Sequence, residues 1–189
     1  KDTSLDYYQK ALAIRLAIYG EIHPSVAYCY VYLGLISFKK EDYTAAKNYY
    51  EKALKIRSTV YGEQHASLAN CYAYLGRICF MQTNYSQSLA YYESAIVINK
   101  AQYKKPHYEI AILYDYIGRI YLAQQNPEEA LRHLQSALHN LIPNFKGVDV
   151  YASTPTDTYY SALRLYKTLG NKALAFEAIY KKNPQNKRA

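Results

Sequence analysis

The side chains that most often bind metal ions recur in this sequence at a constant spacing. Three histidines, His23, His65 and His107, lie 42 residues apart. A zinc ion needs histidine nitrogens within about 2.0–2.1 Å, whereas the axes of packed helices lie about 8–10 Å apart. Equivalent positions of successive repeats therefore cannot share one ion. We interpret the histidines as residues at the starts of helices, and we expect neither a metal nor another cofactor.

The cysteines and hydroxyl groups also fail to make a reactive site. Cys29, Cys71 and Cys79 are an odd number of thiols, and the first residues of the sequence do not have the pattern of a signal peptide. This predicts reduced, packed core residues in a cytoplasmic protein, or in a host cytosol if the chain is a delivered bacterial effector. We find no Ser–His–Asp order, nucleotide-binding loop or paired acidic residues, so no enzyme is expected.

Arginine and tyrosine are the remaining candidates for chemistry. The chain has 25 tyrosines among 189 residues, and its net charge is +8. Arginine binds carboxylates through two parallel hydrogen bonds, and tyrosine is a frequent contact residue at interfaces. This composition favours an acidic partner. No apolar run is long enough to span a membrane, so membrane insertion is not expected.

These residues belong to an internal repeat. Between residues 7–44 and 49–86, 21 of 38 aligned residues are identical, and a third copy follows at the same offset. Apolar residues at i, i+3, i+4 and i+7 predict helices at 4–18, 24–39, 43–60, 66–81, 85–102, 107–123, 127–141, 155–167 and 173–181. Helix pairs of this size must stack to bury their apolar faces. The sequence therefore predicts an all-α solenoid of stacked antiparallel helix pairs.

The domain is expected to cover residues 4–181, with a partial copy at 4–20, full copies at about 24–62, 66–104, 107–141 and 155–181, and a basic tail at 182–189. Asn126 and Thr154 each precede a proline, which is typical of a helix start. Gly20 and Gly62 stand where helices end. The helix at 4–18 is expected to expose apolar residues such as Leu12 and Leu16.

A glycine in three of the helices predicts close packing against the next helix. Gly34, Gly76 and Gly118 each follow a Tyr-Leu or Tyr-Ile pair. Without a side chain, each allows the second helix of its own pair to approach closely. Tyr30, Tyr72 and Tyr114 should pack on the same side.

The segments Tyr32-Leu33-Gly34, Tyr74-Leu75-Gly76 and Tyr116-Ile117-Gly118, followed by Tyr-Tyr-x-x-Ala-Leu or variants, resemble the tetratricopeptide repeat. The 42-residue period with Tyr-Gly-Glu-x-His resembles the repeats of kinesin light chains. The resemblance implies an all-α, right-handed superhelical solenoid with a concave peptide-binding surface lined by the first helix of each pair. Kinesin light chains typically carry Asn just before the Leu-Gly pair, whereas this chain carries Tyr.

We expect a non-catalytic module that binds another protein through an extended segment of acidic and apolar residues. The expected groove residues lie on the first helices of the pairs: Tyr28, Tyr32, Leu35, Asn70, Tyr74, Arg77, Tyr116, Arg119 and Arg164. A basic, aromatic-rich repeat could instead bind RNA or single-stranded nucleic acid, although its lysines are scattered over several helices. A third alternative is a self-association module of a larger sensor or effector protein.

Overall fold

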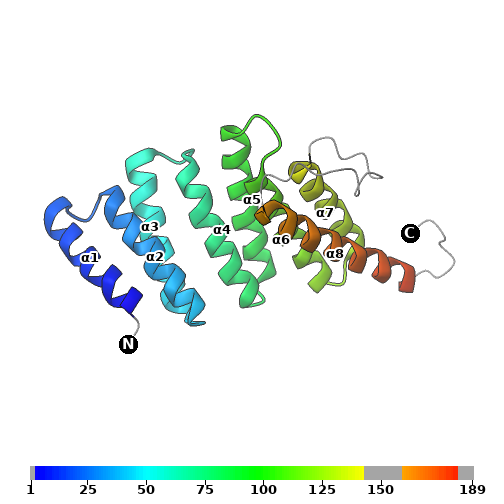
Figure 1. Ribbon diagram of the computed structural model, residues 1–189, viewed down its shortest axis with the longest axis horizontal. Helices are drawn as coiled ribbons and strands as arrows, with labels where there is room; N and C mark the ends of the chain where they lie inside the picture. Colours follow the sequence, from blue (N-terminus) through cyan, green and yellow to red (C-terminus); the bar gives the residue numbers. More distant parts are fainter. Residues whose placement is uncertain (1–2, 143–158, 183–189) are drawn as a thin grey trace. The chain divides into compact units, whose positions relative to one another are not determined.

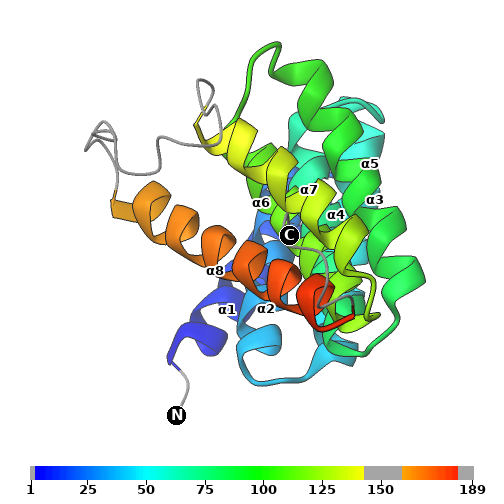
Figure 2. The same ribbon diagram turned by 90° about the vertical axis from the view of Figure 1, so that its right-hand side faces the viewer.

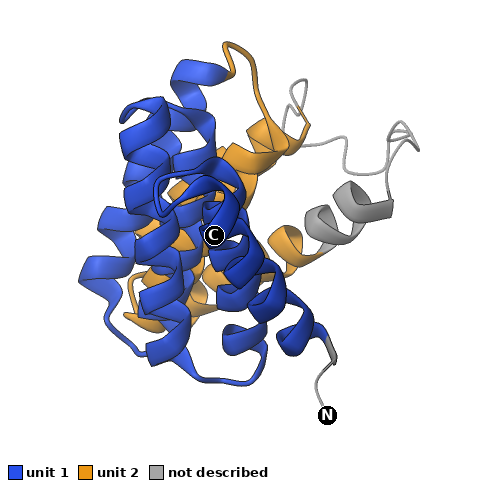
Figure 3. Ribbon diagram, turned by 90° about the vertical axis from the view of Figure 1, so that its left-hand side faces the viewer, with its two compact units in different colours: residues 1–102 blue, residues 103–189 orange. Residues whose placement is uncertain are grey.

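A computed structural model of the chain describes residues 3–142 and 159–182, which form helices and connecting turns without β-strands. The chain divides into unit 1, Lys1–Gln102, and unit 2, Tyr103–Ala189 (Figure 3). In chain order the helices are α1 (Thr3–Tyr19), α2 (Pro24–Lys39), α3 (Tyr43–Tyr61), α4 (Ala66–Met81), α5 (Tyr85–Gln102), α6 (Tyr108–Ala123), α7 (Pro127–Leu141) and α8 (Tyr159–Lys182) (Figure 1). The predicted all-α class of antiparallel helix pairs is confirmed.

The three repeated histidines cap helix starts, as their spacing predicted. The Nδ1 atom of each accepts a hydrogen bond from the backbone N–H two residues later, at 3.1 Å for His23, 3.2 Å for His65 and 3.3 Å for His107. This bond satisfies one of the free N–H groups of the first turn. Gly20 and Gly62 follow the preceding helices with positive φ angles of 75° and 79°, a conformation that glycine adopts without strain.

Each glycine of the Leu-Gly or Ile-Gly pairs lies against the second helix of its own pair, which confirms the predicted facing. A Cβ atom at Gly34 would lie 2.9 Å from the Tyr50 ring, and one at Gly76 would lie 2.8 Å from the Tyr92 ring. In unit 2, a Cβ atom at Gly118 would lie 2.6 Å from the Leu134 side chain. There is no room for a larger residue at these positions.

The thiols are packed inside unit 1. Cys29, Cys71 and Cys79 are free and buried, as expected. The expectation for α1 was wrong in part, because Leu12 and Leu16 are half-buried and pack against the core of unit 1. The exposed apolar residues of α1 are Tyr7, Ile14, Ile18 and Tyr19.

The last helix corrects the prediction of two helices at 155–167 and 173–181. Residues 159–182 form one helix, α8, and the predicted start at Thr154–Pro155 lies outside the described residues. Thr168 Oγ1 and Asn171 Nδ2 donate to Asp115 Oδ1 of α6 at 2.9 and 3.2 Å. Thr168 and Asn171 are three residues apart, so they lie on one face of α8. Their contacts with α6 therefore favour a helix at the residues where the sequence predicted a turn.

A second contact within unit 2 lies at the C-terminal end of α8. Figure 2 shows the C-terminal end of α8 beside the start of α7. There Lys182 Nζ donates to the backbone oxygen of Gln125 at 3.1 Å. Asn126 caps α7 by accepting a hydrogen bond from Glu129 N, as predicted.

Candidate functional site

Two tyrosines of the predicted groove set hold neighbouring helices of unit 1 together. The Tyr32 ring stacks on Tyr8 of α1, with centroids 4.7 Å apart and planes 7° apart. The Tyr74 ring stacks on Tyr50 of α3 in the same way, at 4.7 Å and 13°. Tyr32 and Tyr74 are therefore half-buried, and a large part of each ring serves packing.

Three residues of the predicted set are exposed on unit 1. Tyr28 is 43% exposed on α2, and Asn70 and Arg77 are exposed on α4. Asn70 is the repeat equivalent of Tyr28, and Arg77 follows it by seven residues, so both lie on one face of α4. We call Tyr28, Asn70 and Arg77 the exposed row. Leu35, by contrast, is half-buried and packs against the core.

Neighbouring aromatic side chains position two residues of the exposed row. The Arg77 guanidinium carbon lies 4.4 Å from the centroid of the Phe38 ring, within the range of a cation–π contact. A hydrogen bond to the side chain of Tyr32 raises the pKa of Tyr28 to about 12. Tyr28 is therefore neutral at physiological pH and presents a hydroxyl group rather than a negative charge.

The remaining predicted residues belong to unit 2. Tyr116 and Arg119 are half-buried on α6, and the Arg119 guanidinium carbon lies 5.5 Å from the centroid of the Tyr116 ring. Arg164 lies in α8, but its side chain is outside the described part of the chain. The predicted residues are thus divided between the two units, with six in unit 1 and three in unit 2.

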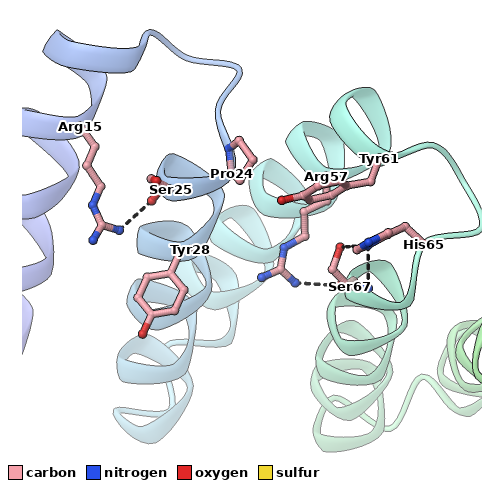
Figure 4. Close-up of a pocket in the computed structure, with 8 residues that line it drawn as sticks. All are labelled: Arg15, Pro24, Ser25, Tyr28, Arg57, Tyr61, His65 and Ser67. Carbon is pink, nitrogen blue, oxygen red and sulfur yellow. Dashed lines mark hydrogen bonds between the residues drawn. The ribbon is translucent and has the colours of Figure 1, made fainter.

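Unit 1 also contains a pocket of about 490 Å³ that the sequence analysis did not predict (Figure 4). It lies where α1 and α3 end and where α2 and α4 begin. Its lining contains two arginines and no carboxylate. The lining residues are Arg15, Pro24, Ser25, Tyr28, Arg57, Tyr61, His65 and Ser67.

The two arginines of the pocket make matching contacts. Arg15 Nη1 donates to the backbone oxygen of Ser25 at 2.8 Å and approaches Cys29 Sγ at 3.3 Å. Arg57 Nη1 donates to the backbone oxygen of Ser67 at 2.7 Å and approaches Cys71 Sγ at 3.4 Å. Figure 4 shows both guanidinium groups extended toward the first turns of the next helices.

A signal for this pocket was present in the sequence. Arg15 and Arg57 end the repeated segment Tyr-Tyr-x-Lys-Ala-Leu-x-Ile-Arg. The predicted groove residues all lie on the first helices of the pairs, whereas these arginines lie on the second helices.

No three His, Cys, Asp or Glu side chains in residues 3–142 and 159–182 are grouped so that they could hold a metal ion. No described helix is both long enough and apolar enough to cross a membrane. The features that remain are exposed aromatic and cationic side chains.

The tetratricopeptide repeat pattern matches the chain three times, over residues 2–58, 30–101 and 82–141. These matches cover more than half of the chain. The protein therefore belongs to the tetratricopeptide repeat family, whose domains are generally protein–protein interaction modules without catalytic activity. Among curated proteins, no relative matches the chain.

Several solved structures have a similar fold. BtubC (BKLC) from P. vanneervenii is 20% identical, with a TM-score of 0.69 over 95% of this chain and 70% of that one. A putative kinesin light chain with nearly identical repeats from Podosopora anserina is 16% identical, with a TM-score of 0.67 over 98% and 88% of the two chains. MamA is 20% identical, with a TM-score of 0.51 over 74% and 80%.

Proposed function

We propose that this chain is a non-catalytic module that binds an extended segment of a partner protein, and that the segment carries acidic and apolar side chains. The observation that supports this most is the exposed row of unit 1, in which Tyr28, Asn70 and Arg77 lie exposed on two successive first helices. Interaction modules use such aromatic and arginine side chains as contact residues.

Charge favours an acidic segment. The chain carries 23 basic and 15 acidic side chains, which increases the rate of encounter with acidic partners. Arg77 is exposed, so a single ion pair there stabilises the complex by only about 0–1 kcal/mol. Replacing the arginine by an acid has a larger effect, because it adds repulsion to the lost attraction. The three free, buried cysteines fit a cytoplasmic setting for this function.

Selection from a library of randomised displayed peptides tests the proposal. We expect the wild-type chain to enrich peptides that combine acidic and apolar residues. The variant Arg77→Glu should bind an enriched peptide about tenfold more weakly. Lys55→Glu, which makes the same charge change at an exposed site on α3, should bind it within about twofold of the wild type. Equal losses in the two variants would mean that binding follows net charge, and the exposed row would then have no special role.

The two alternatives are outcomes of parallel measurements. Tight, strongly salt-dependent binding of homopolymer RNA together with no peptide enrichment would favour a nucleic-acid-binding function. Light scattering that gives the mass of a dimer or larger assembly would favour a self-association module. A monomer that enriches acidic peptides and ignores RNA would support the proposal.

A further inference from the structure

The pocket of unit 1 holds two positive charges whose hydrogen-bonding capacity is only partly used. Arginine is always protonated and has five N–H donors. In Arg15 and Arg57 the recorded bonds all involve Nη1. Among the residues that the structure describes, Nε and Nη2 of both side chains have no hydrogen-bond partner. Both side chains are half-buried.

Nothing in the lining neutralises the two charges. None of the eight lining residues is acidic. Burial raises the pKa of the Cys71 thiol against the opposing effect of Arg57, so the neighbouring sulfur is a neutral thiol rather than a thiolate. The carbonyl oxygens of Ser25 and Ser67 hold the guanidinium groups in place without cancelling their charge. The pocket is therefore cationic and preorganised.

The third copy of the repeat has neither the arginine nor the serine that line the pocket in the first two copies. The repeat equivalent of Arg57 is Asn99, and the equivalents of Ser67 and Cys71 are Glu109 and Leu113. Glu109 Oε2 accepts a hydrogen bond from Tyr103 OH at 3.2 Å. A neutral amide and a carboxylate thus replace a cation and a hydroxyl. The cationic arrangement belongs to the first two copies and is not a general property of the repeat.

We propose that Arg15 and Arg57 form a binding site for two acidic side chains of the partner's segment, one at each guanidinium group, with an apolar side chain between them against Tyr28. Figure 4 places Tyr28 between the two arginines in the view, and the Arg15 guanidinium carbon lies 5.5 Å from its ring centroid. A volume of about 490 Å³ is within the usual range of ligand pockets. This inference rests on the proposed function and adds a site that shares only Tyr28 with the exposed row.

The Nε–Hε signals of the arginines in a ¹⁵N NMR spectrum provide a test that needs no known partner. The probe is the capped tripeptide acetyl-Glu-Leu-Glu-amide, and acetyl-Gln-Leu-Gln-amide is its neutral control. We expect the signals of Arg15 and Arg57 to shift and saturate with the acidic probe only, while the Arg77 signal stays in place. No shift, or equal shifts for all arginines, would overturn the proposal. Inorganic phosphate that saturates the same two signals at lower concentration would also overturn it, because the site would then be a general anion site.

A pair of variants tests the arginines against charge alone. Arg15→Lys with Arg57→Lys keeps the charge but loses the two parallel hydrogen bonds that a guanidinium offers a carboxylate. Lys10→Gln with Lys55→Gln removes two positive charges from exposed positions on the same two helices, α1 and α3. We expect at least a tenfold loss of affinity for the acidic probe in the arginine variant and less than twofold in the lysine variant. Equal losses would overturn the proposal. Should the arginine variant fail to fold in a thermal melt, the NMR titration of the wild-type chain still decides.

Failure of this inference is distinguishable from failure of the proposed function. Peptide enrichment that depends on Arg77, without any shift of the Arg15 and Arg57 signals, would support the proposed function and overturn this site. Saturating signals at Arg15 and Arg57 without any peptide enrichment would support the site and contradict the broader function.

Discussion

Unit 1 and unit 2 pack the same kind of helix pair with different chemistry. In unit 1, the rings of Tyr50 and Tyr92 fill the space beside the helix glycines, and these side chains carry no charge. In unit 2, Leu134 takes the equivalent place, and a buried carboxylate, Asp115, joins α6 to α8. This repeat therefore specifies the spacing of its helices and leaves the chemistry of the contacts free to vary. The two units should therefore respond differently to mutation and to pH.

The largest expected effect is the loss of the buried carboxylate of unit 2. Asp115 is 1% exposed and accepts hydrogen bonds from Thr168 and Asn171. Hydrogen bonds to charged groups contribute about 1.5–3 kcal/mol each, so Asp115→Ala should lower the free energy of unfolding by about 3 kcal/mol. Asp115→Asn keeps an oxygen acceptor and should lose about 1 kcal/mol. Urea unfolding followed by circular dichroism measures both, and equal losses would contradict the role given to the carboxylate.

A second prediction concerns the tight contact of unit 1. A Cβ atom at Gly76 would lie 2.8 Å from the Tyr92 ring, so Gly76→Leu should cost about 1–3 kcal/mol through overpacking. Gly170 of α8 is the matched control, because a Cβ atom there would meet nothing within 4 Å. Gly170→Ala should raise stability by up to about 1 kcal/mol, since alanine favours the helix more than glycine does. A Gly76→Leu chain that melts at the wild-type temperature would show that the facing of α4 is wrong.

The third prediction is a pH effect confined to unit 2. His133 stacks on Tyr121 with ring centroids 5.2 Å apart. Burial, and then the charge of Arg132, lower its pKa below 6.5, while Glu129 opposes the shift. The unfolded chain therefore binds the proton more readily, so this contribution to stability is complete above about pH 6.5 and is lost as the pH falls through the lower pKa of the folded state.

The variant His133→Tyr restores the residue type found at the equivalent positions of unit 1, Tyr49 and Tyr91. Its melting temperature should fall less between neutral and mildly acidic pH than that of the wild type. If the melting temperatures of the two chains fall by the same amount over that pH range, the assignment of this effect to His133 is contradicted.

The smallest expected effect is the removal of one hydroxyl group from unit 1. Tyr50 is fully buried, and its OH has no hydrogen-bond partner among the described residues. Burial also raises its pKa. An unpaired buried hydroxyl costs stability, so Tyr50→Phe should be neutral or stabilising by up to about 1 kcal/mol. A loss of stability in a thermal melt would indicate a hydrogen bond that this account lacks.

Much of the fold could be predicted because its signals are local. The predicted helices at 24–39, 66–81, 85–102 and 127–141 have the observed bounds, since histidine, asparagine and proline at the helix starts act within one turn. The break predicted after residue 167 failed for a non-local reason. The segment around Thr168 stays helical where it bonds to Asp115, 53 residues earlier in the chain, and spacing along the chain does not reveal that contact.

The candidate site was harder to predict from the sequence than the fold. Periodicity placed Tyr74 on one helical face, but only the packed structure shows that its ring stacks on Tyr50. Replacing Tyr74 would therefore disturb the core of unit 1 as well as any binding. Arg15 and Arg57 lie near the ends of α1 and α3, and their direction depends on the turns that bring Ser25 and Ser67 beside them.

The most direct test of the central claim, that the chain binds an acidic segment through its exposed row, is a double-mutant cycle. Calorimetry would measure the binding free energies of a library-enriched peptide and of its Glu→Gln counterpart. Each peptide would be titrated into the wild-type chain and into the Arg77→Gln variant. We expect the losses of binding free energy caused by the two changes to be non-additive, with a coupling of at least about 0.5 kcal/mol, because a contact between the two groups is lost only once. The same cycle with Lys55→Gln should be additive. Additive losses at Arg77 as well would contradict the claim.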